Sequence, residues 1–351
     1  MNHFSEKIIS WYEKNKRDLP WRNTKDAYLI WLSEIILQQT RVEQGKSYYL
    51  KFVKTFPTVK HLAKADNELV MKLWQGLGYY SRARNLHTTA QIITDTYKGN
   101  FPDQYKDILS LKGIGEYTAA AIASFAYNKP HAVVDGNVYR VLSRVFGIET
   151  PIDSTQGKQE FYQLANELID KKNPAIHNQA IMELGAIQCK PVSPDCSVCP
   201  LNTMCFAYSK NRISDLPVKA KKTKVRNRYF NYIVLHHKST TAINKRGEKD
   251  IWTNLYDFPL IETDTELTEE QFIQSADWKQ FIGSAKYIVK SVSISYKHVL
   301  SHQKIYARFW EIECEKPFNK LLSKTCIVIK EKDIHKYAVP RLIDIYLNRL
   351  S

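Results

Sequence analysis

The amino-acid sequence predicts a multidomain protein in which an all-α domain is followed by a basic linker and then by a smaller α/β domain. Its 351 residues exceed the roughly 100–200 that one domain usually holds, and a hydrophobic share of 44% supplies enough apolar surface for packed cores. Residues 1–205 show helical periodicity, whereas the chain beyond residue 229 is rich in Val, Ile, Tyr and Phe with partial alternation. We therefore expect a helical domain over 1–208, a linker over 209–228 and an α/β domain over 229–351.

Local signals place individual elements in both domains. Asp26 is expected to cap a helix, because its side chain can accept the free amides of a first helical turn. Gly147 is expected to end another helix, because glycine readily adopts the left-handed conformation found at helix C-termini. The predicted helices are Ala27–Gln39, Pro102–Ser110, Glu116–Ala126, Val138–Phe146 and Pro340–Leu350, and the predicted strands are Tyr229–His236, Tyr287–Tyr296 and Ile305–Glu313.

The net charge of +15 is concentrated in the linker. Residues 1–205 hold 25 basic and 20 acidic residues, a net of +5, whereas residues 206–230 hold eight basic residues and one acidic residue, a net of +7. Residues 231–351 hold 18 basic and 15 acidic residues, a net of +3. A basic protein is typical of nucleic-acid binders, but a solvated lysine tether has the same composition. Charge alone leaves both interpretations open.

Composition excludes several other classes of protein. No apolar run approaches the roughly 18 residues that a membrane span needs, so we expect no membrane association. Six cysteines are too few for a disulfide scaffold of this length. The residues after Met1 match neither a secretory signal nor a transit peptide, and the cytoplasm is therefore the expected compartment.

Four of the six cysteines lie within 17 residues, with the spacing C-x6-C-x2-C-x5-C. Zinc sites more often contain two separated pairs of close ligands, whereas a compact set of four thiolates also suits an iron–sulfur cluster. The spacing favours an iron–sulfur cluster, with a zinc site and unligated core thiols as the alternatives. The candidate ligands are Cys189, Cys196, Cys199 and Cys205.

A glycine-containing turn is expected between the helix that ends near Ser110 and the helix that begins near Glu116. Gly113 and Gly115 allow the backbone to turn tightly and to approach another surface closely. The following helix then presents its free amides to an anion such as a DNA phosphate. An ordinary interhelical turn has the same sequence signal.

Two carboxylates occupy contrasting positions. Glu34 shares a helix face with Ile30 and Trp31, so we expect a partly desolvated carboxyl group with a raised pKa, as a general acid needs. Asp135 lies at the start of a helix, where the dipole and the free amides favour its ionised form. An exposed glutamate and an ordinary capping aspartate are the simpler interpretations of the two residues.

Taken together, these motifs resemble the adenine DNA glycosylases of the MutY type, within the helix-hairpin-helix glycosylase superfamily. The resemblance covers nearly the whole chain, and the order and spacing of the motifs carry it. They are Leu19-Pro20-Trp21-Arg22, Trp31-Leu32-Ser33-Glu34, Gln38-Gln39-Thr40, Gly76-Leu77-Gly78-Tyr79-Tyr80-Ser81-Arg82-Ala83-Arg84, the glycine turn, Val134-Asp135-Gly136-Asn137 and the four cysteines.

The resemblance implies a helix-hairpin-helix glycosylase domain with a [4Fe-4S] loop over 189–205, followed by a Nudix-like domain that recognises 8-oxoguanine. It implies that a monomer binds double-stranded DNA, flips adenine out of an A:8-oxoguanine or A:G pair and hydrolyses its N-glycosidic bond. Glu34 would protonate the adenine and later activate water, while Asp135 would stabilise the oxocarbenium-like sugar.

Other roles follow from the resemblance residue by residue. Ser301 and His302 would read 8-oxoguanine, although a polar loop between strands is the generic interpretation. Tyr117 and Asn137 would organise the catalytic pair, Arg22 and Gln179 would line the adenine pocket, Gln39, Thr40 and Tyr79 would contact DNA around the lesion, and Gly113 and Gly115 would offer amides to phosphate.

Tyr117 separates this interpretation from its nearest alternative, a bifunctional endonuclease III-like glycosylase and lyase for oxidised pyrimidines. Those enzymes carry a lysine here, and a phenol cannot form their Schiff base. A non-catalytic iron–sulfur DNA-binding protein is the other alternative. Three residues depart from the family pattern: Leu300 replaces the usual Phe, Lys112 replaces the usual Pro, and Tyr139 occupies a position where some members have Lys.

Overall fold

The computed structural model describes residues 3–220, 225–248, 251–318, 321–323 and 325–349. They form two compact units, the first from residues 1–65 and 85–221 and the second from residues 66–84 and 222–351. Lys221, Lys222 and Lys224 of the basic linker lie outside the described residues. The expected boundaries of the helical domain, the linker and the α/β domain stay a prediction. The segment 66–84 belongs to the second unit, although it precedes most of the first unit in sequence.

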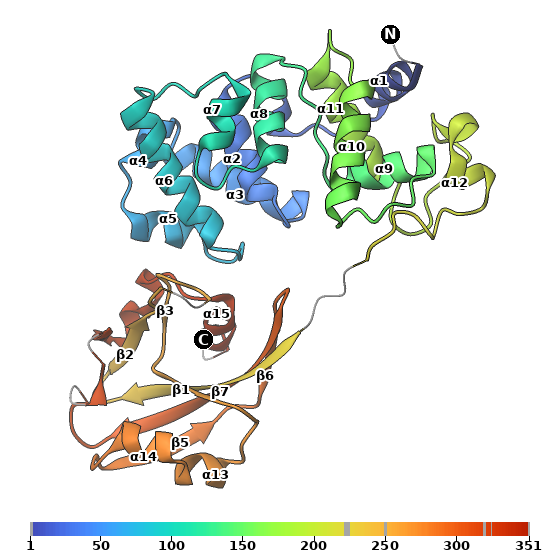
Figure 1. The fold of residues 1–351 in the computed structure, drawn as a ribbon. Coiled ribbons are helices and arrows are strands. Elements are labelled where there is room, and N and C mark those ends of the chain that lie inside the picture. The colour runs from blue at the N-terminus through green and yellow to red at the C-terminus, as the bar shows by residue number, and fades with distance from the viewer. Residues whose placement is uncertain (1–2, 221–224, 249–250, 319–320, 324, 350–351) are drawn as a thin grey trace. The chain divides into compact units, whose positions relative to one another are not determined.

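The first unit is built from helices joined by short turns (Figure 1). Its elements are α1 (His3–Asn15), η1 (Pro20–Arg22), α2 (Ala27–Leu37), α3 (Val42–Thr55), α4 (Val59–Ala63), α6 (Ser81–Thr96), α7 (Tyr105–Ser110), α8 (Glu116–Tyr127), α9 (Gly136–Phe146), α10 (Thr155–Leu168), α11 (Pro174–Glu183), η2 (Leu184–Gln188), η3 (Asn202–Met204) and α12 (Phe206–Ser209).

Helix α2 is buried along most of its length. Asp26 caps it as expected, because its carboxylate accepts a hydrogen bond of 2.8 Å from the amide of Tyr28. Residues 27–36 are buried except for Leu29, so the helix is enclosed on nearly all sides. Helix α8 packs against α2, and its run of alanines permits a close approach. Glu34 is therefore carried into the interior by the helix on which it lies.

The predicted helix boundaries are largely confirmed. Gly147 has φ of +70° and ends α9 as expected. The predicted helix Pro102–Ser110 begins only at Tyr105, because residues 102–104 remain non-helical. Between α7 and α8, Gly113 has φ of +77°, and an added Cβ would lie 2.7 Å from the Asn85 side chain. This turn therefore requires glycine at residue 113.

The second unit combines two sheets with short helices (Figure 1). In the larger sheet the order is β4-β1-β7-β5 with β6 also paired to β7, and in the smaller sheet it is β3-β2-β8. Among the strand pairs that the structure describes, only β1–β7 is parallel. The elements are α5 (Asn67–Trp74), β1 (Arg226–His236), β2 (Thr240–Lys245), β3 (Tyr256–Asp257), β4 (Leu260–Thr263), α13 (Glu269–Gln274), α14 (Ala276–Ile282), β5 (Tyr287–Val292), β6 (Tyr296–Val299), β7 (Gln303–Cys314), β8 (Cys326–Lys330), η5 (Glu331–Lys336) and α15 (Arg341–Leu347).

One strand prediction is wrong. The expected single strand Tyr287–Tyr296 is divided into β5 and β6, which pair with different parts of β7. The register shifts between Val289 and Ser291, and the Ser293 hydroxyl then accepts a hydrogen bond of 2.9 Å from the amide of Phe309. A side chain thus takes part in the pairing where a continuous strand would use only backbone groups.

No helix among the described residues is both long and apolar enough to cross a lipid bilayer.

His236, at the end of β1, contacts two carboxylates of the second unit. Its Nε2 contacts Glu311, and its Nδ1 lies 2.7 Å from Oε1 of Glu331. The hydrogen bond with Glu311 is the main reason that the pKa of His236 rises to about 9, with Glu331 adding to it and burial opposing it. A raised histidine pKa stabilises the folded state fully below the unfolded value of about 6.5, and this stabilisation disappears as the pH rises through 9.

We predict that His236→Gln lowers the free energy of unfolding by about 2 kcal/mol at pH 7 and by progressively less between pH 8 and pH 10. Urea denaturation across this range measures the difference. His237→Gln is the matched control, because the His237 imidazole contacts the Cys314 carbonyl rather than a carboxylate. An effect of His236→Gln that is independent of pH would contradict the assigned cause.

Candidate active site

A cavity of about 540 Å³ opens in the first unit. Residues from η1, α2, α3, α8, α9, α11 and η2 line it, so parts of the chain that are distant in sequence contribute to one space. It brings together eight residues that the sequence singled out, namely Arg22, Glu34, Gln39, Thr40, Tyr117, Asp135, Asn137 and Gln179.

Glu34 is a buried acid of this cavity. Its side chain belongs to α2, and the residue is only 8% exposed. Burial raises the pKa of Glu34 to about 7, and the negative charge of Asp135 acts in the same direction. The raised pKa expected from the sequence is therefore confirmed, and a carboxyl group with this pKa can hold a proton near neutrality.

The Tyr117 hydroxyl partly opposes the rise in the pKa of Glu34. It donates a hydrogen bond of 2.8 Å to Oε2 of Glu34 from helix α8, and it also lies 3.9 Å from Sδ of Met182. Because the bond stabilises the carboxylate, it lowers the pKa of Glu34 relative to burial alone. Burial, followed by the nearby Glu34 charge, raises the pKa of Tyr117 well above its ordinary value, so the phenol remains protonated.

We predict that Tyr117→Phe moves the pKa of Glu34 above 7, because the variant loses the hydrogen bond that favours the carboxylate. Carbon-13 NMR of labelled glutamate carboxyl groups, recorded against pH, measures the change. Tyr127→Phe serves as the control, since Tyr127 lies on the same helix but bonds the Phe101 carbonyl. A Glu34 pKa that stays at 7 or falls would show that the tyrosine does not stabilise the carboxylate.

Asp135 caps α9 as expected, but its pKa differs from expectation. Oδ1 accepts the amides of Asn137 at 2.9 Å and Val138 at 2.8 Å, and Oδ2 accepts Nδ2 of Asn137 at 2.8 Å. The helix start was expected to favour ionisation. Burial instead raises the pKa of Asp135 above its ordinary value, although the three hydrogen bonds oppose it. The pKa differs from expectation because Asp135 not only caps α9 but also lines the cavity.

Arg140 connects Asn137 to the next turn of the chain. Its Nη2 donates to Oδ1 of Asn137 at 2.9 Å and to the Gly185 carbonyl at 2.6 Å, while Nε donates to the Cys189 carbonyl at 2.7 Å. These contacts leave the Asn137 amide nitrogen directed at Asp135. The orientation of Asn137 is therefore set by a residue one helical turn further along α9.

A buried ion-pair cluster in the cavity wall had no sequence signal of its own. Glu183, whose side chain has no exposed surface, accepts hydrogen bonds from both Arg17 and Arg22. Burial opposes ionisation of this carboxyl group, but the hydrogen bonds from the two arginines lower the pKa of Glu183 to about 2. Gln179 is held separately, because its Oε1 accepts a 2.6 Å hydrogen bond from the Tyr12 hydroxyl.

Gly113, Gly115 and Tyr79 are not among the residues that line the cavity. Gly113 and Gly115 form the turn before α8, where Gly115 is the N-cap residue and an added Cβ would meet nothing within 4 Å. Tyr79 is 48% exposed and has φ of +47°. The Arg82 guanidinium lies over the Tyr79 ring, 5.6 Å from its centroid. Tyr79 is therefore an exposed aromatic ring supported from one side.

Ser301 and His302 are exposed at the tip of the turn that joins β6 to β7. The turn is closed by a 2.8 Å hydrogen bond from the amide of Leu300 to the carbonyl of Gln303. Leu300 itself packs against the core of the second unit. The replacement of Phe by Leu at residue 300 thus affects a packed position next to the tip.

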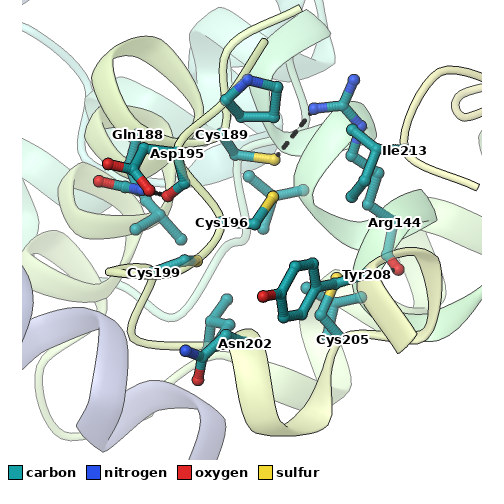
Figure 2. Close-up of a pocket in the computed structure, with 15 residues that line it drawn as sticks. Arg144, Gln188, Cys189, Asp195, Cys196, Cys199, Asn202, Cys205, Tyr208 and Ile213 are labelled. Atoms are coloured by element: carbon teal, nitrogen blue, oxygen red, sulfur yellow. Dashed lines mark hydrogen bonds between the residues drawn. The ribbon is translucent and has the colours of Figure 1, made fainter. Parts of the chain in front are cut away.

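The four clustered cysteines line one pocket together with Arg144 (Figure 2). Nη1 of Arg144 donates to Sγ of Cys189 at 3.4 Å and to the carbonyl of Lys190 at 2.8 Å. The four cysteines form no disulfides, and burial raises the pKa of the Cys199 thiol to about 11. Metal binding would therefore have to displace protons.

The candidate ligands in this pocket are thiols, and they line its wall rather than converge on a single ion position. Within the described residues, no group of three or more His, Cys, Asp or Glu side chains is close enough to hold a single ion. Four thiols from one short loop, beside a buried arginine that can donate to sulfur, are a donor set that suits an iron–sulfur cluster. The residues present therefore fit that group chemically.

The cavity can support acid-assisted cleavage of a bond to carbon. Glu34 can donate a proton near neutral pH, and the negative charge of Asp135 can stabilise a reacting centre that becomes positive as the bond breaks. Tyr117 is protonated, and the described residues that line the cavity include no lysine, so they provide no amine nucleophile.

Comparison with protein families yields two matches. Residues 32–171 match the HhH-GPD superfamily of base excision DNA repair proteins, and residues 231–349 match the NUDIX domain. An adenine DNA glycosylase of Buchnera aphidicola subsp. Acyrthosiphon pisum is 35% identical over 300 residues, which cover 85% of this chain and 83% of that protein. The human adenine DNA glycosylase is 43% identical over 216 residues, covering 59% of this chain and 40% of that protein.

Solved structures resemble the helical part. A thermostable thymine-DNA glycosylase superposes with a TM-score of 0.55 and 31% identity, covering 59% of this chain and 95% of that chain. Endonuclease III trapped as a covalent intermediate with DNA superposes with a TM-score of 0.52 and 21% identity, covering 59% of this chain and 94% of that chain. The second likeness concerns the fold alone.

Proposed function

Because the chain belongs to the adenine DNA glycosylases, monofunctional enzymes that excise adenine in base excision repair, we propose that its substrates are adenines opposite 8-oxoguanine or guanine. The observation that carries this proposal is the cavity in which Glu34 and Asp135 meet, together with a Nudix-like second domain in the same chain. The target adenine would leave the duplex and enter this cavity, and unstacking is easiest at a mispair.

Glu34 is the proposed general acid. In its protonated form it would donate to N7 of the flipped adenine and thereby convert the base into a better leaving group. The support is its burial, with a pKa of about 7. Once deprotonated, the same carboxylate would remove a proton from the attacking water, as microscopic reversibility allows. Tyr117 would hold the carboxyl group in place through its 2.8 Å hydrogen bond.

Asp135 is the proposed stabiliser of the positive charge that develops on the sugar. Its two oxygens are fixed by the amides of Asn137 and Val138 and by the Asn137 side chain, so little reorganisation accompanies the reaction. Arg22 and Gln179 would line the base-binding part of the cavity.

Further residues would engage the duplex. Gly113 and Gly115 would offer backbone amides to phosphate at the turn before α8. Gln39 has φ of +53° and is exposed at the end of α2, where it would fill space in the DNA stack together with Tyr79, and Thr40 would lie beside it. Double-stranded DNA is thus the partner. A monomer that acts in the cytoplasm stays the prediction for assembly and compartment.

Cys189, Cys196, Cys199 and Cys205 would hold a [4Fe-4S] cluster. Such a cluster, when bound, links the two ends of the loop 189–205 and provides a redox-active centre. Arg144 would donate to the Cys189 sulfur, and its backbone carbonyl lies 3.4 Å from Sγ of Cys205. These contacts support the assignment because they tie the loop to α9, the helix that Asp135 caps.

Ser301 and His302 are the proposed readers of 8-oxoguanine, because they are exposed polar residues at a closed turn. We predict that the double substitution by Ala lowers the single-turnover rate on A:8-oxoguanine duplexes by roughly tenfold while changing the rate on A:G little, since a lost hydrogen bond costs about 1 kcal/mol. Ser323→Ala, on another exposed segment of the second unit, is the control. An unchanged ratio of the two rates would remove the assigned role.

A further inference from the structure

Glu183 is surrounded by more positive charge than it can neutralise. Its Oε1 accepts the backbone amide of Arg17 at 3.0 Å and Nε of Arg17 at 2.8 Å. Its Oε2 accepts Nη2 of Arg17 and Nη2 of Arg22, both at 2.7 Å. With two arginines on one ionised carboxylate, this part of the cavity wall carries a net charge of +1.

Arg22 is the connection between this cluster and the proposed acid. Both Arg22 and Glu34 line the cavity, and the positive charge of Arg22 acts to lower the pKa of Glu34. The Arg22 side chain is only 13% exposed, so water screens its charge weakly. Any loss of the negative charge beside Arg22 would therefore lower the pKa of Glu34.

We propose that Glu183 is a positioning residue that keeps Glu34 protonated at neutral pH, because it neutralises the arginine charge that would otherwise favour the Glu34 carboxylate. This inference rests on the proposed function, in which Glu34 must donate a proton. Glu183 does not itself need to touch the substrate, since its influence is transmitted through Arg17 and Arg22.

The charged and titratable groups around Glu34 can be assigned by element and by sign. Burial in α2 and the negative charge of Asp135 from α9 favour the protonated acid. The Tyr117 hydroxyl from α8 and the Arg22 charge from η1 favour the carboxylate. Glu183, at the end of α11, acts against the Arg22 charge, so its removal shifts the balance toward the carboxylate.

The test compares three variants that change the charge of the wall in steps. Glu183→Gln raises it from +1 to +2, Arg17→Gln lowers it to 0, and the double variant restores +1. The readouts are the pH dependence of single-turnover adenine excision and the carbon-13 NMR titration of the Glu34 carboxyl group. The expected result is that Glu183→Gln moves the alkaline limb of the rate profile and the Glu34 titration to lower pH by about one unit. The double variant is expected to return both toward the wild-type position.

A rate that falls equally at every pH in Glu183→Gln, with the Glu34 titration unmoved, would overturn the inference and leave only a structural role. Should Glu183→Gln not fold, Arg17→Gln decides, because it must move the titration to higher pH. Glu183→Asp keeps the charge and is expected to titrate like the wild type. Absence of adenine excision by the wild type would refute the proposed function, whereas the NMR titration would still test the electrostatic inference.

Discussion

Replacing Glu34 by Gln is expected to lower adenine excision by a factor of roughly 10²–10⁴, the contribution typical of a positioned general acid. Gln matches Glu in shape and can still accept the Tyr117 hydrogen bond through its carbonyl oxygen, but it has no acidic proton to transfer to the base. Binding to an A:8-oxoguanine duplex should remain close to that of the wild type, because the cavity keeps its shape and the surface contacts with DNA are unchanged. Single-turnover kinetics and equilibrium binding measure the two effects separately.

Glu43→Gln is the matched control for this prediction. Glu43 is an exposed residue in the first turn of α3, and it does not line the cavity. The Glu43→Gln variant should excise adenine at nearly the wild-type rate. Wild-type activity in Glu34→Gln would contradict the assigned acid, whereas an equal loss of DNA binding would indicate a disturbed fold.

Replacing Asp135 by Asn is expected to lower excision by roughly 10²-fold or more, because a preorganised charge aimed at the developing cation is lost. The amide can still accept hydrogen bonds through its oxygen, but its NH₂ group cannot accept one. One of the three donors on Asn137 and Val138 therefore loses its partner. The variant should lose about 1 kcal/mol of stability from the weakened cap, which is too little to explain the fall in rate.

The pH dependence of excision follows from the same two groups. The rate should fall as the pH rises through about 7, where Glu34 loses its proton. It should also fall at low pH, where Asp135 becomes protonated, and burial moves this limb above the pH typical of an exposed aspartate. Asp135→Asn removes the acid limb and retains the alkaline limb.

Asp26→Asn is the matched control for Asp135→Asn. Asp26 also caps a helix through a backbone amide, but it lies outside the cavity lining. A similar small loss of stability with an unchanged excision rate is expected. A rate loss of the same size in both variants would assign the effect of Asp135 to capping rather than to charge.

Local signals were sufficient to predict much of the helical domain. The helix ends predicted at Asp26, Asp135 and Gly147 are confirmed, because capping depends on neighbouring residues alone. Burial of Glu34 was likewise predictable from the apolar residues on its helix face. In the second unit, strands β1 and β7 were predicted within a few residues by their β-branched and aromatic content.

Features that depend on distant residues were not predictable. Glu183 meets Arg17 and Arg22 only because α11 folds back beside η1, and these partners are separated by more than 160 residues. The raised pKa of Asp135 depends on the enclosure of the cavity, which the cap itself does not reveal. The division of β5 from β6 reflects pairing with two parts of β7, and periodicity within one segment carries no information on its partner.

The central claim is that Glu34 and Asp135 hydrolyse the adenine N-glycosidic bond without an amine nucleophile. The most direct test incubates the protein with a duplex that has one A:8-oxoguanine pair and a label on the adenine strand. The products are analysed with and without alkali treatment, and a parallel reaction contains borohydride. We expect free adenine, strand cleavage only after alkali, and no trapped enzyme–DNA adduct. Failure to release adenine, or strand cleavage without alkali accompanied by a borohydride-trapped adduct, would contradict it.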